Sequence, residues 1–323
     1  MLDCDKLLVD CGKQHGLNVI NKGCSIMKIE TAVKEYLVEI EIRKYTEKTI
    51  KTYRIKLGIF SRFCAENDIT DTDDLTKGII KLFTQQMMKR GKKGTYINGC
   101  LKTIKSFIQY CYDEDYGAFD TKRGGFKWVK EEKPVIRAFS TRDVKRMLDN
   151  CRGADYMSIR DTAILTVLFE TGIRCMELYS IKKSDIHDDF IVINGKNHKQ
   201  RVVPITPVMR KALMKYERVR ESYFAFKAIE EYYFLSYRGK RLTNSGMEHM
   251  LKRRGEGIEG IRVSPHTCRH FFAQQQIKMG TDLYTISRLL GHENISITQI
   301  YLNSLKDSDI IKIAKQNSVL MNL

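Results

Sequence analysis

Four short stretches in the second half of the chain contain arginine, lysine, histidine and tyrosine at spacings that suit phosphate chemistry. The first contains Arg174 and Glu177 and follows the apolar run 162–169. Gly172 permits a tight connection between helices and places Arg174 at the start of the next helix, a position suited to an anion. Glu177 lies three residues later on the same face, where it could buttress the guanidinium group. Taken alone, the pattern also describes a surface Arg–Glu pair after a turn.

The second stretch contains Lys196 and Lys199 between two β-branched runs, residues 190–193 and 201–205. The runs predict a β-hairpin with both lysines at its tip. A hairpin tip can carry a flexible ammonium group to a DNA backbone or a scissile bond. A solvated basic turn is the alternative interpretation.

The third stretch contains His266 and Arg269, directly after Pro265 and before His270. If a helix begins near His266, positions i and i+3 share a face, so His266 and Arg269 are expected to point the same way. Two histidines could also indicate a metal. No carboxylate or third ligand accompanies them at a usable spacing, and we expect no metal site.

The fourth stretch contains Gly291 and His292 and, nine residues later, Tyr301. Gly291 is expected to end a helix that begins near Leu283 and to turn the chain into a short helical segment that carries Tyr301. The chain has 16 tyrosines, so the position of Tyr301 alone proves little. Together the four stretches supply a nucleophile, cationic donors and an acid, which are the groups that metal-free DNA cutting requires.

The charge of the chain is consistent with a polyanionic partner. Lys and Arg number 56 against 39 Asp and Glu, for a net charge of +17. Both halves, divided at residue 138, are basic, which fits two domains that hold one polyanion. A soluble protein that is simply basic is the alternative.

The elements that must position these residues are predicted to form a mostly α structure with a small β-sheet (α+β). Residues 1–27 show little periodicity and form a lead-in of unknown role. Apolar side chains at helical spacing predict four helices, one from residue 29, then 47–67, one after 76 and 95–113, which make a helical bundle. Gly and Pro interrupt a mixed-charge stretch that predicts a linker. The predicted boundaries are 28–115 for the bundle, 116–138 for the linker and 139–323 for a second, mostly helical domain with a third short strand at 232–236 and an amphipathic C-terminal helix near residues 308–320.

Composition also excludes several classes of protein. The apolar runs are too short to span a bilayer, and the start of the chain does not resemble a secretory signal. Nine cysteines form no C-x-x-C pair or Cys/His metal pattern. We therefore expect reduced thiols in the cytoplasm, with neither zinc nor structural disulfides.

The four stretches, in this order, resemble the tyrosine recombinase (phage integrase) family. The shared motifs are T-G-x-R-x-x-E-L, G-K-x-x-K-x-R-x-V-P, H-x-x-R-H, and L-L-G-H with a tyrosine nine residues later. The hairpin departs mildly, with Asn197 and His198 where Gly-Asn is common, and the residues after His270 are unusually rich in glutamine. The helical bundle resembles the family's core-binding domain only in pattern.

The resemblance implies a site-specific recombinase in which Tyr301 attacks the scissile phosphate and leaves a 3′-phosphotyrosyl link. Arg174 and Arg269 would grip the non-bridging oxygens, and Lys196 would protonate the 5′-oxygen. His266 would be the base or proton relay, and His292 would hydrogen-bond the phosphate. No metal, ATP or other cofactor is implied.

The implied partner is double-stranded DNA with specific recombination sites. The protein would be a homotetramer on DNA and a monomer or weak oligomer without it, with a possible accessory DNA-bending or directionality protein and no membrane. We expect DNA contacts at Lys199, Arg201, Lys89, Arg90, Lys92 and Lys93. A type IB topoisomerase and a catalytically inactive DNA-binding regulator remain as alternatives.

Overall fold

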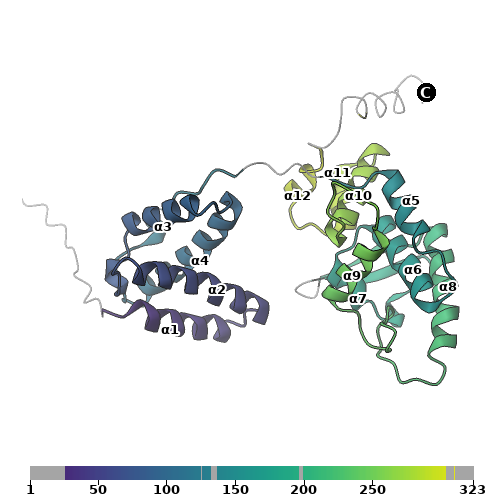
Figure 1. The fold of residues 1–323 in the computed structure, drawn as a ribbon, viewed down its shortest axis with the longest axis horizontal. Coiled ribbons are helices and arrows are strands. Elements are labelled where there is room, and N and C mark those ends of the chain that lie inside the picture. The colour runs from purple at the N-terminus through teal and green to yellow at the C-terminus, as the bar shows by residue number, and fades with distance from the viewer. Residues whose placement is uncertain (1–25, 125, 132–136, 196–198, 303–308, 310–323) are drawn as a thin grey trace, which may run out of the picture. The chain divides into compact units, whose positions relative to one another are not determined.

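The computed structural model describes residues 26–124, 126–131, 137–195, 199–302 and 309 (Figure 1). The chain divides into two compact units, residues 1–133 and 134–323. Across the described residues, no helix combines the length and apolarity that crossing a membrane requires.

The first unit is a helical bundle, as predicted. Its long helices enclose an apolar core that includes Leu57, Phe60, Phe83 and Leu101. Thr46 caps the second helix through the amide of Thr49, since a threonine oxygen can accept from the otherwise unpaired first-turn N–H groups. The elements are α1 (Ile29–Ile42), α2 (Glu47–Ala65), η1 (Thr72–Asp74), α3 (Lys77–Lys89), α4 (Gly94–Asp113) and η2 (Thr121–Arg123).

The predicted linker packs on this bundle in its described part up to Glu131, whereas Arg137 and Ala138 contact the second unit. Phe119, Phe126 and Val129 contact the core, and Asn98 exchanges two hydrogen bonds with the backbone of Val129, at 2.8 and 2.9 Å. The glycines and charged residues of this stretch predicted a linker. Its aromatic side chains nevertheless bury apolar area, and they do so without a periodic pattern in the sequence. The stretch up to Glu131 therefore belongs to the first unit.

The second unit is mostly helical and is built around α6, which is buried along most of its length and packs against α8 and α10 (Figure 1). Buried Asp161 on α6 accepts hydrogen bonds from Arg253 and Arg254, which ties α6 to α9. The elements are α5 (Thr141–Asp149), α6 (Tyr156–Thr171), α7 (Cys175–Ser180), η3 (Lys183–Asp185), β1 (Phe190–Asn194), β2 (Gln200–Pro204), α8 (Pro207–Tyr223), α9 (Asn244–Arg254), α10 (Pro265–Lys278), α11 (Leu283–Leu290) and α12 (Ser296–Gln299).

The predicted hairpin is confirmed, and the predicted third strand is wrong. β1 and β2 pair antiparallel with Ile191 opposite Val203, and both of these side chains are buried. Residues 232–236 form only isolated bridges, Lys182 with Tyr232 and Leu235 with Arg241. The aromatic residues that suggested a strand fill the core beside α8 instead, as Tyr233 and Phe234 do against Tyr216.

Candidate active site

Arg174 lies where the sequence placed it, at the N-cap of α7. The preceding helix α6 ends at Gly172, whose φ of 60° is a left-handed conformation that glycine adopts without strain. A Cβ atom at Gly172 would lie 2.5 Å from Cδ1 of Phe272. Close packing of α10 against this turn thus requires glycine, and the turn fixes the start of α7.

Glu177 is buried and binds both Arg174 and Arg201. Its carboxylate accepts from the backbone N–H of Arg174 at 2.7 Å and from Nη1 of Arg174 at 3.0 Å. Arg201 donates to both oxygens, at 3.0 and 2.7 Å. Burial would raise the pKa of Glu177, but the hydrogen bonds and charge of Arg201, together with those of Arg174, hold it below its usual value. Glu177 therefore contacts Arg174 as expected and also contacts Arg201, while its supporting role stays a prediction.

The C-terminus of α11 gathers three arginines. The carbonyl oxygens of Leu289, Leu290 and Gly291 accept, respectively, from Nε of Arg201 at 2.9 Å, Nη2 of Arg269 at 2.8 Å and Nη2 of Arg174 at 3.1 Å. The last carbonyls of a helix lack partners within it and carry partial negative charge, so they suit cationic donors. Three guanidinium groups from three elements, α10, β2 and the start of α7, are therefore held at one helix end.

Arg269 is buried between two turns. Its Nη1 donates to the carbonyl of Gly172 at 2.9 Å, in addition to the bond to Leu290. Burial and the positive charge of Arg174 lower the pKa of Arg269 to about 10, which leaves it charged at neutral pH.

His292 follows Gly291 and lies among the same cations. Its Nδ1 and Oγ1 of Thr298 are 2.8 Å apart. Burial and the charges of Arg269, Arg174 and Arg201 lower the pKa of His292 to about 4. The imidazole is therefore neutral at pH 7 and can donate one N–H to a phosphate oxygen while the other nitrogen is held by Thr298.

Tyr301 is buried just beyond α12, in an apolar cluster with Phe272 and Leu290. Burial raises the pKa of its phenol, and the positive charges of Arg269 and Arg174 partly offset this effect. Its hydroxyl lies 3.1 Å from Nδ1 of His270. The nucleophile candidate and both arginines thus share one electrostatic environment.

His266 and Arg269 differ in burial, and their expected common direction stays a prediction. His266 is exposed in the first turn of α10, whereas Arg269 is buried. The 100° step of an α-helix puts residues i and i+4 on one face as well as i and i+3, and the packing of α10 turns the face of Arg269 inward. The imidazole beside Tyr301 belongs to His270, one turn after His266.

The predicted lysines fall in different places. Lys196 lies outside the described residues. Lys199 is exposed and pairs with Glu293, which follows His292, at 2.7 Å. In the other unit Lys89, Arg90, Lys92 and Lys93 are exposed at the end of α3 and the turn to α4, where Arg90 contacts Glu66 at 3.2 Å.

The predicted C-terminal helix also lies outside the described residues, apart from Asp309. The Asp309 carboxylate lies 3.2 Å from Nζ of Lys278, at the end of α10 of the same chain.

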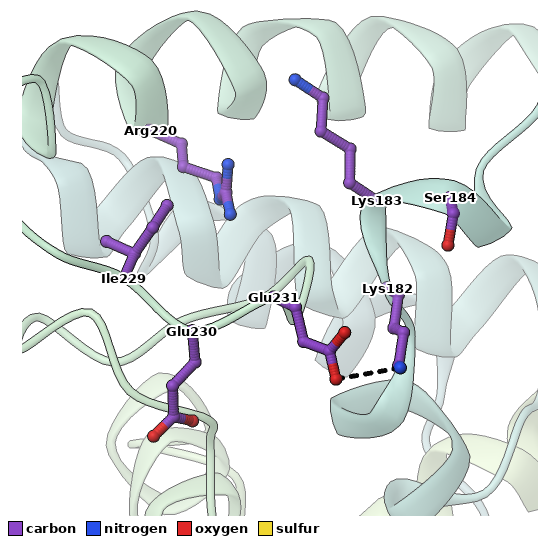
Figure 2. A pocket seen from close by; sticks show the side chains of 7 residues that line it. All are labelled: Lys182, Lys183, Ser184, Arg220, Ile229, Glu230 and Glu231. Atoms are coloured by element: carbon purple, nitrogen blue, oxygen red, sulfur yellow. Dashed lines mark ion pairs between the residues drawn. The ribbon is translucent and has the colours of Figure 1, made fainter.

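A separate pocket of roughly 400 Å³ is lined by residues of mixed charge near η3 and α8. Figure 2 shows Lys182 and Glu231 pointing toward one another there, and their charged atoms are 2.9 Å apart. No predicted site residue lines this pocket. In the described part of the chain, no group of three or more His, Cys, Asp or Glu side chains is arranged to hold a metal ion.

Two contributors escaped the sequence reasoning. Arg201 was predicted to contact DNA, but its side chain is largely buried against Glu177. Arg201 lies on the same face of β2 as buried Val203, which the strand pattern could have indicated, but its partner Glu177 comes from α7 and is distant in sequence. His270 is the last residue of the H-x-x-R-H box, and its i+4 spacing to His266 puts both on one face of the helix, so the spacing did not show which of them contacts Tyr301.

Comparisons with known proteins agree with this geometry. Residues 137–308 match the model of the phage integrase family, and residues 33–115 match that of the phage integrase N-terminal SAM-like domain. Tyrosine recombinase XerD of Oceanobacillus iheyensis is 30% identical over 86% of this chain and 95% of its own length. Tyrosine recombinase XerC of Pseudomonas syringae pv. syringae is 28% identical over 80% of this chain and 86% of its own.

Solved structures share the fold. The Tn1549 transposon integrase in complex with transposon right end DNA has a TM-score of 0.70 at 16% identity, covering 91% of this chain and 100% of that one. A lambda integrase dimer bound to a COC′ core site has a TM-score of 0.68 at 16% identity, with 87% and 97% covered. The matched domains, the relatives and the placement of Arg174, Arg269, His292 and Tyr301 lead to one conclusion: the chain belongs to the phage integrase family of tyrosine recombinases, enzymes that cut and rejoin DNA strands.

Proposed function

We propose that this chain is a site-specific recombinase whose nucleophile is Tyr301 and whose phosphate-binding groups are Arg174, Arg269 and His292. The observation that carries the proposal is the shared environment of the four side chains. Burial and the charges of Arg269 and Arg174 lower the pKa of His292, and the same charges partly offset the rise that burial causes in the pKa of Tyr301. A phosphate that approaches Tyr301 meets these donors at the same time.

The arginines suit the transition state better than lysines because planar guanidinium groups can donate two parallel hydrogen bonds to phosphate oxygens. Glu177 and the carbonyls of α11 fix their orientation before DNA arrives. Such preorganised donors stabilise developing charge without reorganising during the reaction.

The remaining roles follow from position and chemistry. Lys196, which falls between β1 and β2 in the sequence, is proposed as the acid that protonates the 5′-oxygen because it matches the family's first hairpin lysine. His266 is exposed at the start of α10, which suits contact with a DNA phosphate. Lys199 is proposed as a phosphate contact that exchanges Glu293 for DNA.

The proposed partner is duplex DNA bearing specific sites. Exposed Lys89, Arg90, Lys92 and Lys93 would contact its backbone from the helical bundle, giving affinity without sequence information. By analogy with a lambda integrase tetramer bound to a Holliday junction, strand exchange would take place in a homotetramer. Without DNA the protein is proposed to be a monomer or weak oligomer, and it is proposed to act in the bacterial cytoplasm. An accessory DNA-bending or directionality protein is a further proposed partner.

The biological reaction is proposed to be either movement of a DNA element or resolution of joined DNA. The relatives include XerD proteins, and the structural neighbours include a transposon integrase. Since the bond energy is kept in the phosphotyrosyl link, neither ATP nor a metal is needed in either case.

The test is covalent capture. The wild-type protein and Tyr301→Phe are incubated with fragments of the DNA that flanks the gene, denatured, and separated on gels. Wild type should form an adduct joined to a 3′-phosphate, and sequencing its DNA should identify one site. Tyr301→Phe removes one oxygen atom and should bind the same DNA without forming an adduct. An adduct of normal yield from this variant would refute Tyr301 as nucleophile, and relaxation of plasmids that lack any site would instead indicate a topoisomerase.

A further inference from the structure

The hydroxyl of Tyr301 has an imidazole beside it that the sequence motifs do not assign. Nδ1 of His270 lies 3.1 Å from the phenolic oxygen, and the two ring centroids are 5.4 Å apart. His270 is half-buried on α10, and Tyr301 is 4% exposed. The contact joins residues 31 positions apart, so it reflects the packing of α10 against the segment after α12 and not local sequence.

Both partners of this hydrogen bond are uncharged at pH 7. Burial, followed by the positive charge of His266 and Arg269, lowers the pKa of His270 below its ordinary 6.5, so the ring is neutral at pH 7. Burial raises the pKa of Tyr301, so the phenol keeps its proton. In the tautomer of His270 that carries its ring proton on Nε2, the phenolic O–H donates to Nδ1.

His270 offers this oxygen a titratable acceptor, and the guanidinium group of Arg269 also hydrogen-bonds the phenol. His266 and Arg269 on α10 bear on its ionisation, and both are cationic or potentially cationic. The segment beyond α12 contributes Tyr301, and α11 presents the apolar side chains of Ile286 and Leu290 to the cluster around the phenol. A neutral imidazole within hydrogen-bonding distance satisfies the geometric requirement for a general base.

We propose that His270 accepts the phenolic proton of Tyr301 during DNA cleavage and returns it during rejoining. In cleavage the O–H bond of Tyr301 breaks, its proton moves to Nδ1, and the phenolic oxygen bonds to phosphorus. The bond from phosphorus to the 5′-oxygen breaks, and that oxygen takes a proton from the proposed acid, Lys196. In rejoining the 5′-hydroxyl returns its proton to Lys196 and attacks phosphorus, and the tyrosine leaves as a phenol with the proton supplied by the His270 imidazolium. The role rests on Tyr301 being the nucleophile, and it displaces His266 from the part of base.

The test uses a nicked suicide duplex built on the site recovered by covalent capture. Single-turnover rates of adduct formation are measured for wild type, His270→Gln, His270→Ala and His266→Gln. Glutamine can still accept a hydrogen bond but cannot take the proton, so His270→Gln separates base from positioning residue. It should cleave about 10²- to 10⁴-fold more slowly, the usual contribution of a general base, while gel-shift affinity stays within a few-fold of wild type.

The pH profile and chemical rescue give readouts that a structural role would not move. The wild-type rate should fall as the pH drops through the pKa of His270, below 6.5, because the imidazolium cannot accept a proton. His270→Gln should lack this acidic limb, and His266→Gln should keep it. Added imidazole should restore cleavage to His270→Ala in proportion to its neutral form, and should not restore His266→Gln.

The outcomes separate this proposal from the assignment of the nucleophile. Two results would overturn the role of His270 without touching the nucleophile, provided that Tyr301→Phe remains inactive. One is cleavage by His270→Gln within about threefold of the wild-type rate, and the other is a pH profile of His270→Gln that keeps the wild-type acidic limb. An adduct from Tyr301→Phe would overturn the nucleophile itself. If thermal unfolding shows that His270→Ala does not fold, the cleavage rate and the pH profile of His270→Gln decide the question alone.

Discussion

The ion pair between Glu177 and Arg201 should be essential for stability because each buried charge compensates the other. Glu177 accepts four hydrogen bonds, two from Arg174 and two from Arg201. Breaking such a buried pair by neutralising one partner costs about 3–5 kcal/mol, because the remaining charge is left uncompensated. We expect about 3 kcal/mol for either Glu177→Gln or Arg201→Met, which lowers the melting temperature of a domain of this size by about 6–12 °C.

The double variant should lose much less than the sum of the two single losses. With both charges removed, neither partner of this pair is left as an unpaired buried charge. The loss in the free energy of unfolding should therefore be about 2 kcal/mol smaller than the sum of the two single losses. Denaturant unfolding of the four proteins measures this coupling. Additivity within about 0.5 kcal/mol would refute the reasoning, because independent sites behave in that way.

The same pair predicts a pH dependence and a loss of activity. The folded protein holds the pKa of Glu177 below its usual 4.5, so the pair contributes stability above that pH and loses it as the pH falls through the lowered value. The stability difference between wild type and Glu177→Gln should therefore shrink in acid. Cleavage by Glu177→Gln should fall about 10- to 100-fold at pH 7, because Arg174 loses its orientation.

Three further predictions concern the hairpin, the end of the chain and a turn. A substrate with a 5′-bridging sulfur needs no proton on its leaving group, so it should rescue Lys196→Ala and not Lys199→Ala, and the reverse pattern would exchange their roles. Deleting residues from Lys306 onward should keep half-site binding in gel shifts, but it should abolish both the cooperative filling of full sites and strand exchange. Normal recombination by the truncated protein would mean that the terminal helix packs only on its own subunit. Gly172→Ala should destabilise the protein by about 1–3 kcal/mol more than Gly260→Ala, because both glycines have positive φ but only the Cβ added at Gly172 meets neighbouring atoms. Equal losses in thermal unfolding would attribute the effect to backbone strain alone.

Periodicity predicted the helices of the bundle and the hairpin, because their apolar faces are regular along the chain. It missed the packing of Phe119 and Phe126, whose aromatic rings stack on each other in an irregular segment. The third strand was predicted from aromatic residues that the core uses for packing against Tyr216. The burial of the aromatic rings in the predicted linker was not expected, and at residues 232–236 the expected backbone geometry was wrong.

The candidate site was predictable where the partners lie close in sequence and not where they come from distant elements. Arg174 and Glu177 are three residues apart, so helix geometry was sufficient to pair them. The contacts of Arg201 with Glu177 and of His270 with Tyr301 join different elements. Only the packing of α10 decides that His270 faces inward and His266 outward.

The way α11 holds the arginines has a consequence for the charge that the site offers to DNA. Its carbonyls orient Arg174, Arg201 and Arg269 as dipoles, without adding a negative ion. Among these described groups only Glu177 carries a full negative charge, and His292 is neutral at pH 7, so the cluster retains a formal charge of about +2. A phosphodiester attacked by a phenolate passes through a state with about two negative charges on its oxygens. A helix end that positions cations without neutralising them thus leaves the cluster with a charge equal and opposite to that of the species it has to stabilise.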